Sequence, residues 1–145
     1  MDLEQNEIIN DICSTKLLYK PGDETIYSDL GMILLGKIVE YITGTSLDIF
    51  VSDYIFKPLG MQSTFFNPSV EKLKRIVPTE IVSGYREGLI HGEVHDENAH
   101  KLGGVAGHAG LFSSTRDLAV FCQMMLNGGI YGENRIFKKS TVNQF

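Results

Sequence analysis

Two consecutive amphipathic helix patterns constrain this chain more than any other feature of its sequence. Apolar residues recur from Leu30 to Thr43 at the three- and four-residue spacing of one helix face. Gly44 then provides a helix stop, and Thr45 or Ser46 provides a cap for the next helix. The second pattern starts at Leu47, and we expect Pro58 to end that helix because proline cannot donate to the preceding turn.

Both helices are expected to bury a broad apolar face. The stripe of the first consists of Leu30, Leu34, Ile38, Tyr41 and Ile42, widened by Leu35 and Val39. The stripe of the second consists of Leu47, Phe50, Val51, Tyr54 and Ile55. Gly36 weakens the first helix, and we expect it to let a neighbouring element approach closely. The predicted fold class is therefore mainly α.

A third clear helix begins after Ser114. Ser114 and Asp117 have the spacing of a capping box, and Gly128-Gly129 provides the stop. Its predicted buried stripe is Leu118, Phe121, Cys122, Met125 and Leu126. Shorter helices are expected from Leu3 to Ile12 and from Val70 to Ile76, with Ser140 as the cap of a last one.

The middle of the chain, residues 67–108, is irregular and polar. Glu80–Tyr85 and Leu89–Val94 are typical of two short strands, so we expect a short β-hairpin there. The same region holds the four histidines, and the glycine-rich run LGGVAGHAGLFSS overlaps its end. A long irregular segment inside a compact domain is more often a functional loop than a linker.

Composition narrows the classes of function. The 145 residues carry a net charge of -5, and the basic residues form no run that could follow a phosphate backbone, so nucleic acid is not an expected partner. No stretch is apolar for long enough to span a bilayer. Two cysteines, Cys13 and Cys122, do not make a disulfide framework, and Cys122 is predicted to be a core residue. These features leave the compartment open.

Tyr27, Ser28 and Asp29 stand directly before the first apolar stripe. Ser and Asp are favoured at helix N-termini, so capping alone would explain two of the three residues. The same position could also serve chemistry. A phenol at a helix N-terminus lies in a positive field, which favours the phenolate and lowers the pKa toward a range useful for proton transfer.

Two longer blocks resemble the penicillin-recognising serine hydrolases, which include class C β-lactamases, DD-peptidases and related esterases. The first is PGDETIYSDLGMILLGKIVEYITGTSLDIFVSDYIFKPLGMQST, and the second is VHDENAHKLGGVAGHAGLFSSTRDLAVFCQMMLNGG. Together they cover most of Lys20–Gly129. The resemblance implies that residues 1–145 are one helical subdomain of an α/β serine hydrolase, truncated at both ends relative to the family.

The resemblance also assigns roles. Tyr27 matches the tyrosine of the family's Y-x-N box, which shuttles protons during acyl transfer to serine. Ser28 and Asp29 would position this loop and the helix start, and Asp29, which replaces the more common Asn, could line the cleft. The parent protein would hydrolyse a β-lactam, a cell-wall peptide or a small ester, without a cofactor. The family suggests the bacterial cell envelope or periplasm as its compartment.

The nucleophile of that family belongs to an S-x-x-K motif well before the tyrosine. Ser69 and Lys72 match the pattern but follow Tyr27, and His108-Ala109-Gly110 matches the family's H-x-G box but precedes a helix. We interpret both as lookalikes. The chain alone is therefore predicted to be inactive. The alternative is a non-catalytic binding or regulatory module that reuses the helical fold.

A metal site is the alternative interpretation of the histidine-rich segment. His91, His95 and His100, with Glu93 and Asp96, are dense enough for a zinc site in a loop, although the spacing is not that of a known helical motif. Hydrogen bonds from Asp96 and Asn98 to the backbone would explain the segment equally well. We expect no metal. The glycines of the LGGVAGHAG run do not form a nucleotide-binding pattern.

Overall fold

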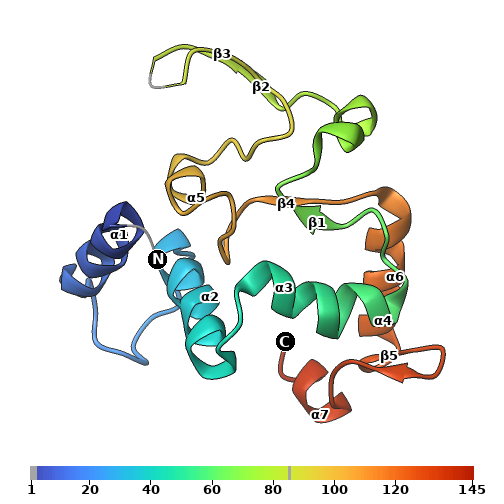
Figure 1. Ribbon diagram of the computed structural model, residues 1–145. Helices are drawn as coiled ribbons and strands as arrows, with labels where there is room; N and C mark the ends of the chain where they lie inside the picture. The colour runs from blue at the N-terminus through green and yellow to red at the C-terminus, as the bar shows by residue number, and fades with distance from the viewer. Residues whose placement is uncertain (1–2, 85) are drawn as a thin grey trace.

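The structure is a computed structural model that describes residues 3–84 and 86–145. Most of its regular structure is helical (Figure 1). The helices are α1 (Leu3–Ser14), α2 (Asp29–Thr43), α3 (Leu47–Val51), α4 (Lys57–Leu59), α5 (Glu97–Lys101), α6 (Thr115–Leu126) and α7 (Lys139–Val142), with a π-turn η1 (Ser52–Phe56) and a 3₁₀-helix η2 (Val70–Arg75). The strands are β1 (Phe65–Phe66), β2 (Glu80–Val82), β3 (Gly88–Ile90), β4 (Leu111–Phe112), β5 (Ile130–Tyr131) and β6 (Asn134–Arg135). They form three antiparallel pairs, β1 with β4, β2 with β3 and β5 with β6.

Two separate hydrophobic clusters hold the fold together. One joins α2, α5 and the glycine-rich run through Ile33, Val94, Ala99, Leu102 and Ala106, and α1 packs on it through Ile8, Ile9 and Ile12. The other joins α4 to α6 through Phe56, Leu59, Met61 and Met124. Figure 1 shows α1 and α2 at one end of the molecule and α6 with β5 at the other.

The start and end of α2 are as predicted. The Ser28 hydroxyl accepts a hydrogen bond from the Gly31 N–H at 3.3 Å, and Gly44 ends the helix in the left-handed conformation. Gly36 is also as predicted, because the backbone of Gly107 packs against it. A Cβ placed at Gly36 would lie 3.1 Å from the Gly107 nitrogen, so a larger residue there would press against this backbone.

The helix that begins at Leu47 continues past Pro58, so the predicted helix end was wrong. The Lys57 N–H donates to the Ser52 carbonyl, five residues earlier, in a π-turn just before the proline. This wider turn relieves the clash between the proline ring and the preceding carbonyls. The helix ends instead at Gly60, in the left-handed conformation. Its start is capped by Glu40, whose carboxylate accepts the Leu47 N–H at 3.0 Å.

The predicted buried faces of two helices were partly wrong. In α2, Ile38 and Leu35 are exposed, and Tyr41 and Ile42 are 91% and 75% exposed, whereas Ile33 and Gly36 are buried. In α6, Leu118, Cys122 and Leu126 are exposed, and the helix faces the core through Met124 instead. Apolar periodicity located these helices, but the elements that pack on them select which residues are covered.

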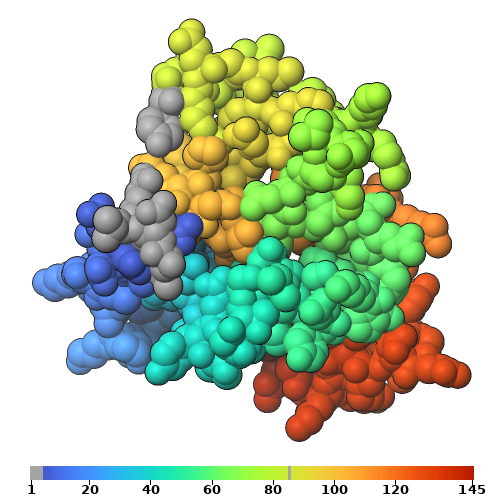
Figure 2. Space-filling model, viewed as in Figure 1, coloured from blue at the N-terminus to red at the C-terminus, as the bar shows by residue number. Residues whose placement is uncertain are grey.

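The middle segment contains the expected hairpin, in shorter form. β2 and β3 pair in antiparallel register, with Glu80 opposite Ile90 and Val82 opposite Gly88. Tyr85, predicted to end the first strand, lies outside the described residues. Figures 1 and 2 show this hairpin projecting from the rest of the molecule. The predicted helix at residues 70–76 is the 3₁₀-helix η2. The N-cap position of the last helix is Lys138 rather than Ser140, and no side chain caps it.

Among the described residues, no single helix has the length and apolar character of a membrane span. The pair formed by α2 and the helix Leu47–Leu59 meets both criteria together, but the two are bent by 78°.

Candidate functional site

The Tyr27 segment forms an exposed corner at the start of α2. Ser28 caps the helix, Asp29 is its first residue, and the Tyr27 side chain is 80% exposed. The cap fixes the backbone that carries the phenol, while the phenol itself projects into solvent. The same turn can therefore both cap the helix and expose the tyrosine.

The pKa of Tyr27 is shifted in the direction opposite to the one expected from the helix N-terminus. A hydrogen bond with Asp29, followed by the negative charge of that carboxylate, raises the pKa of Tyr27 above its ordinary value. The expected lowering was wrong for this chain, because the carboxylate of Asp29, two residues along, acts on the phenol. A lowered pKa would need cations near the phenol.

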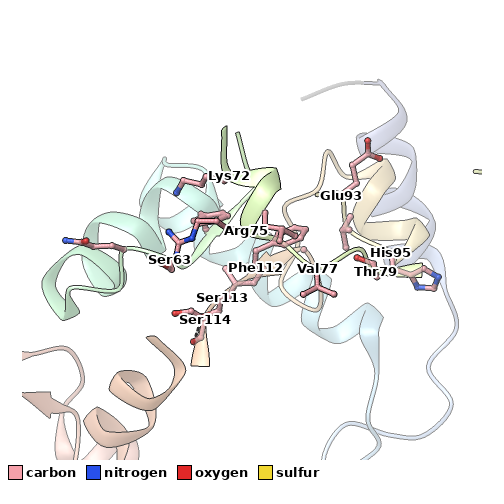
Figure 3. Close-up of a pocket in the computed structure, with 16 residues that line it drawn as sticks. Ser63, Lys72, Arg75, Val77, Thr79, Glu93, His95, Phe112, Ser113 and Ser114 are labelled. Carbon is pink, nitrogen blue, oxygen red and sulfur yellow. Dashed lines mark hydrogen bonds between the residues drawn. The ribbon is translucent and has the colours of Figure 1, made fainter. Parts of the chain in front are cut away.

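A cavity of about 550 Å³ lies between η2, β4 and the loop before β1 (Figure 3). Tyr27, Ser28 and Asp29 are not among the residues that line it. In Figure 3, Lys72 and Arg75 lie toward the end of the cavity that carries Ser63, whereas His95 and Glu93 lie at the opposite end. The cavity therefore has a cationic end and an end that carries an acid and a histidine.

The floor of the cationic end is fixed by the buried carboxylate of Asp117, which is 5% exposed. It accepts hydrogen bonds from the Ser63 N–H at 2.7 Å and from the Thr64 hydroxyl at 2.8 Å. The Asp117 N–H in turn donates to the Ser114 hydroxyl at 3.3 Å. Sequence reasoning identified Asp117 only as a helix cap and missed its link to Ser63 and Thr64. The spacing of the capping box was the available signal, but it says nothing about a partner more than fifty residues away.

The histidines of the middle segment are held by separate partners. His91 Nε2 contacts the carbonyls of Leu73 and Ile76, at 3.1 Å and 2.8 Å, and so acts as a donor. His95 pairs with Glu80 at 2.9 Å. Within the described ranges, no group of three or more candidate ligands is arranged to hold a metal ion.

His108 and Asp96 form a pair that sequence reasoning did not predict. His108 Nε2 lies 2.8 Å from Asp96 Oδ1, and the His108 side chain is 3% exposed. Asp96 also caps α5 by accepting the Ala99 N–H at 2.7 Å. Burial raises the pKa of Asp96, but the Ala99 N–H and His108 lower it more, so the net shift is downward. His108 therefore braces the glycine-rich turn against α5.

The S-x-x-K lookalike does not have the arrangement of a nucleophile and its base. Ser69 precedes η2 and hydrogen-bonds to the Glu71 carboxyl, whose pKa it lowers. The ammonium of Lys72 lies 3.6 Å from the centre of the Phe65 ring. The structure thus directs the two side chains to different partners.

Comparison with known proteins places this arrangement in a family. The family model described as Beta-lactamase matches residues 1–144. The chain is 44% identical over 155 residues to an Escherichia coli protein named "Putative D-alanyl-D-alanine carboxypeptidase", an alignment that covers 98% of this chain and 36% of that protein. The chain belongs to the beta-lactamase family, and it spans about a third of the length of the curated relatives it matches.

Two solved structures share the fold. The octameric penicillin-binding protein homologue from Pyrococcus abyssi matches 99% of this chain and 30% of its own, with a TM-score of 0.66 and 22% identity. D-amino acid amidase from Ochrobactrum anthropi matches 98% of this chain and 39% of its own, with a TM-score of 0.65 and 20% identity. The mainly helical structure therefore corresponds to a part of β-lactamase-like folds.

Proposed function

We propose that this chain is the helical subdomain of a serine hydrolase that acts through a serine acyl-enzyme. The substrate class is a cell-wall peptide, a β-lactam or a small ester, with a D-alanyl peptide favoured by the name of the E. coli relative. The family match over residues 1–144, together with coverage of only 36% of that relative, carries the proposal. The serine and its lysine would lie in segments outside this sequence.

In this proposal Tyr27 is the general acid and base. It would take a proton from the serine during acylation and return one to the leaving group. Its support is the exposed phenol on a capped turn, in the sequence order that the family uses. Cations from the remaining segments would have to offset the effect of Asp29 on the pKa of Tyr27. Ser28 and Asp29 would hold the turn.

The test compares Tyr27→Phe with the unchanged protein in a full-length chain that includes these residues. We expect hydrolysis of a D-alanyl-D-alanine peptide to slow by roughly 100-fold to 10,000-fold, the usual contribution of a positioned acid or base. Tyr41→Phe is the matched control, because Tyr41 is an exposed tyrosine on the same helix. Equal rates for Tyr27→Phe and the unchanged protein would refute the role of Tyr27.

Mass spectrometry after incubation with penicillin or a fluorophosphonate tests the acyl-enzyme. The full-length protein should gain one adduct, whereas residues 1–145 alone should gain none, because an acyl-enzyme needs its nucleophile and oxyanion donors together. A stoichiometric adduct on residues 1–145 would contradict the proposal. A full-length protein without an adduct would favour the non-catalytic binding module.

A further inference from the structure

We propose that the cationic end of the 550 Å³ cavity binds the carboxylate of a peptide, through Arg75 and Lys72 together with the hydroxyls of Ser63 and Ser114. The peptide part of this proposal rests on the proposed function, and because Tyr27 does not line the cavity, the site is a binding site separate from the Tyr27 turn. The carboxylate part rests on the geometry of the cavity alone.

The two cations are not neutralised within the described part of the chain. There, the Arg75 side chain has neither an acidic partner nor a hydrogen bond, and Lys72 has only the face of the Phe65 ring. The cation–π contact keeps the Lys72 ammonium near the cavity without using its charge-assisted hydrogen bonds. A planar guanidinium can bind a carboxylate through two parallel hydrogen bonds.

Of the four hydroxyls at this end, two have already donated their hydrogen and two keep it. Thr64 donates to Asp117, so the Thr64 oxygen accepts from Ser113, and the hydrogen of Ser113 is already used. The Ser114 hydroxyl accepts from the Asp117 N–H and keeps its own hydrogen for a ligand. Ser63 is held through its N–H, and among the described residues its hydroxyl has no partner. Ser63 and Ser114 are thus the neutral donors.

The acids near the cavity have partners of their own, and these acids include Asp117 beneath the cationic end, whose carboxylate accepts the Ser63 N–H and the Thr64 hydroxyl. Glu93 lines the opposite end, and its carboxylate lies 3.8 Å from the Arg86 guanidinium and 3.9 Å from His100 Nδ1 (Figure 3). Glu71 is hydrogen-bonded to Ser69. A peptide chain that leaves its carboxylate at Arg75 could therefore run along the apolar walls formed by Phe112 and Val77 toward His95. The cavity has the volume of a small-molecule site.

The test is an NMR titration of ¹⁵N-labelled residues 1–145 with N-acetyl-D-alanyl-D-alanine and with its C-terminal amide, at constant ionic strength. We expect the free acid to shift the amide signals of Ser63, Arg75 and Ser114, and to bind at least about tenfold more tightly than the amide. Arg75→Gln should weaken binding of the acid about tenfold. Lys74→Gln is the matched control, because Lys74 is a cation of the same 3₁₀-helix that does not line the cavity.

Three results would overturn the proposal. They are equal binding of the acid and the amide, an equal loss from Lys74→Gln and Arg75→Gln, or no shift at the cavity. Inorganic phosphate is the third probe. If phosphate binds more tightly than the dipeptide acid, the cavity is a site for free anions and not for peptides. The titration measures binding only, so its failure would leave the acyl-enzyme experiments on the full-length protein independent.

Discussion

Asp29 is the residue that decides the acidity of Tyr27 in this chain. Its carboxylate raises the pKa of the phenol through a hydrogen bond and through its charge. Asn at this position would keep an amide near the phenol but remove the charge, so the pKa of the phenol would then depend on other neighbours.

We therefore expect Asp29→Asn to lower the pKa of Tyr27 toward the ordinary value of about 10. The measurement is an NMR titration of ¹³Cζ-labelled tyrosine, with the Tyr27 signal assigned by its loss in Tyr27→Phe. Asp48→Asn, in the first turn of α3, is the control and should leave the Tyr27 titration unchanged. An unchanged or raised pKa of Tyr27 in Asp29→Asn would show that the Asp29 carboxylate does not control the acidity of the phenol.

Asp96 predicts a pH dependence of stability. Its pKa in the folded protein lies below the ordinary value, so the unfolded chain binds the proton at a higher pH than the folded chain does. The contribution of Asp96 is therefore complete above its unfolded pKa of about 3.9 and is lost as the pH falls through the folded pKa.

Urea unfolding of the unchanged protein and of Asp96→Asn, between about pH 5 and about pH 2.5, measures this contribution. The free energy of unfolding should fall with decreasing pH more steeply in the unchanged protein. Asp23→Asn, in an exposed turn, should keep the slope of the unchanged protein. Equal slopes in all three proteins would show that the Asp96–His108 pair does not form in solution.

At the scale of elements, the junction between α2 and the glycine-rich run depends on two glycines. The Cβ of an alanine at Gly36 would lie 3.1 Å from the Gly107 nitrogen and 3.3 Å from Leu47 Cδ2. We expect Gly36→Ala to lower the free energy of unfolding by about 1–3 kcal/mol, because overpacking outweighs the gain in helix propensity.

Gly31→Ala provides the opposite case on the same helix. Its Cβ would meet only the Ser28 Cβ at 3.9 Å, so this substitution should stabilise α2 by about 0.5–1 kcal/mol. Urea unfolding of both variants measures the difference. The close contact of α2 with Gly107 would be refuted by Gly36→Ala stabilising the protein as much as Gly31→Ala.

Local sequence patterns predicted the positions of the helices and strands more accurately than they predicted which side chains are buried. Ser28, Gly44 and Ser114 act as the caps and stops that short-range rules assign, and the hairpin follows β-propensity. The π-turn before Pro58 was not predictable, because no simple pattern of residues marks a change in hydrogen-bond register. The cavity was not predictable either, since Ser63, Arg75 and Ser114 meet only through the fold.

The role of Tyr27 is a different case. Sequence resemblance proposed it, and the structure describes its turn, but the serine and lysine that it would serve are proposed to lie in segments outside this sequence. Its function therefore stays a prediction until the full-length protein is measured.

At the scale of the whole molecule, the outer face of α2 is an apolar surface exposed to solvent. Leu35, Ile38 and Ile42 are exposed together, although periodicity predicts them as buried. The chain aligns with 36% of its E. coli relative. The residues that pack on an apolar helix face need not therefore belong to this sequence. A contiguous apolar face of this kind binds hydrophobic dyes.

We expect residues 1–145 to enhance the fluorescence of anilinonaphthalene sulfonate, and the double variant Ile38→Lys and Ile42→Lys to remove at least about half of the signal. The control, Leu89→Lys with Leu126→Lys, adds the same charge at two exposed apolar positions on separate elements. Equal losses in the two double variants would mean that dye binding reports scattered surface residues.

The two hydrophobic clusters have a consequence for cooperativity. They share no residue, and the bend of 78° between α2 and the helix that follows separates them. Glu40 spans this bend, accepting the Leu47 N–H while it pairs with Lys37 at 2.8 Å. We therefore expect amide exchange to give α5 and α6 different protection. The bend at Glu40 then sets how strongly the two clusters unfold together.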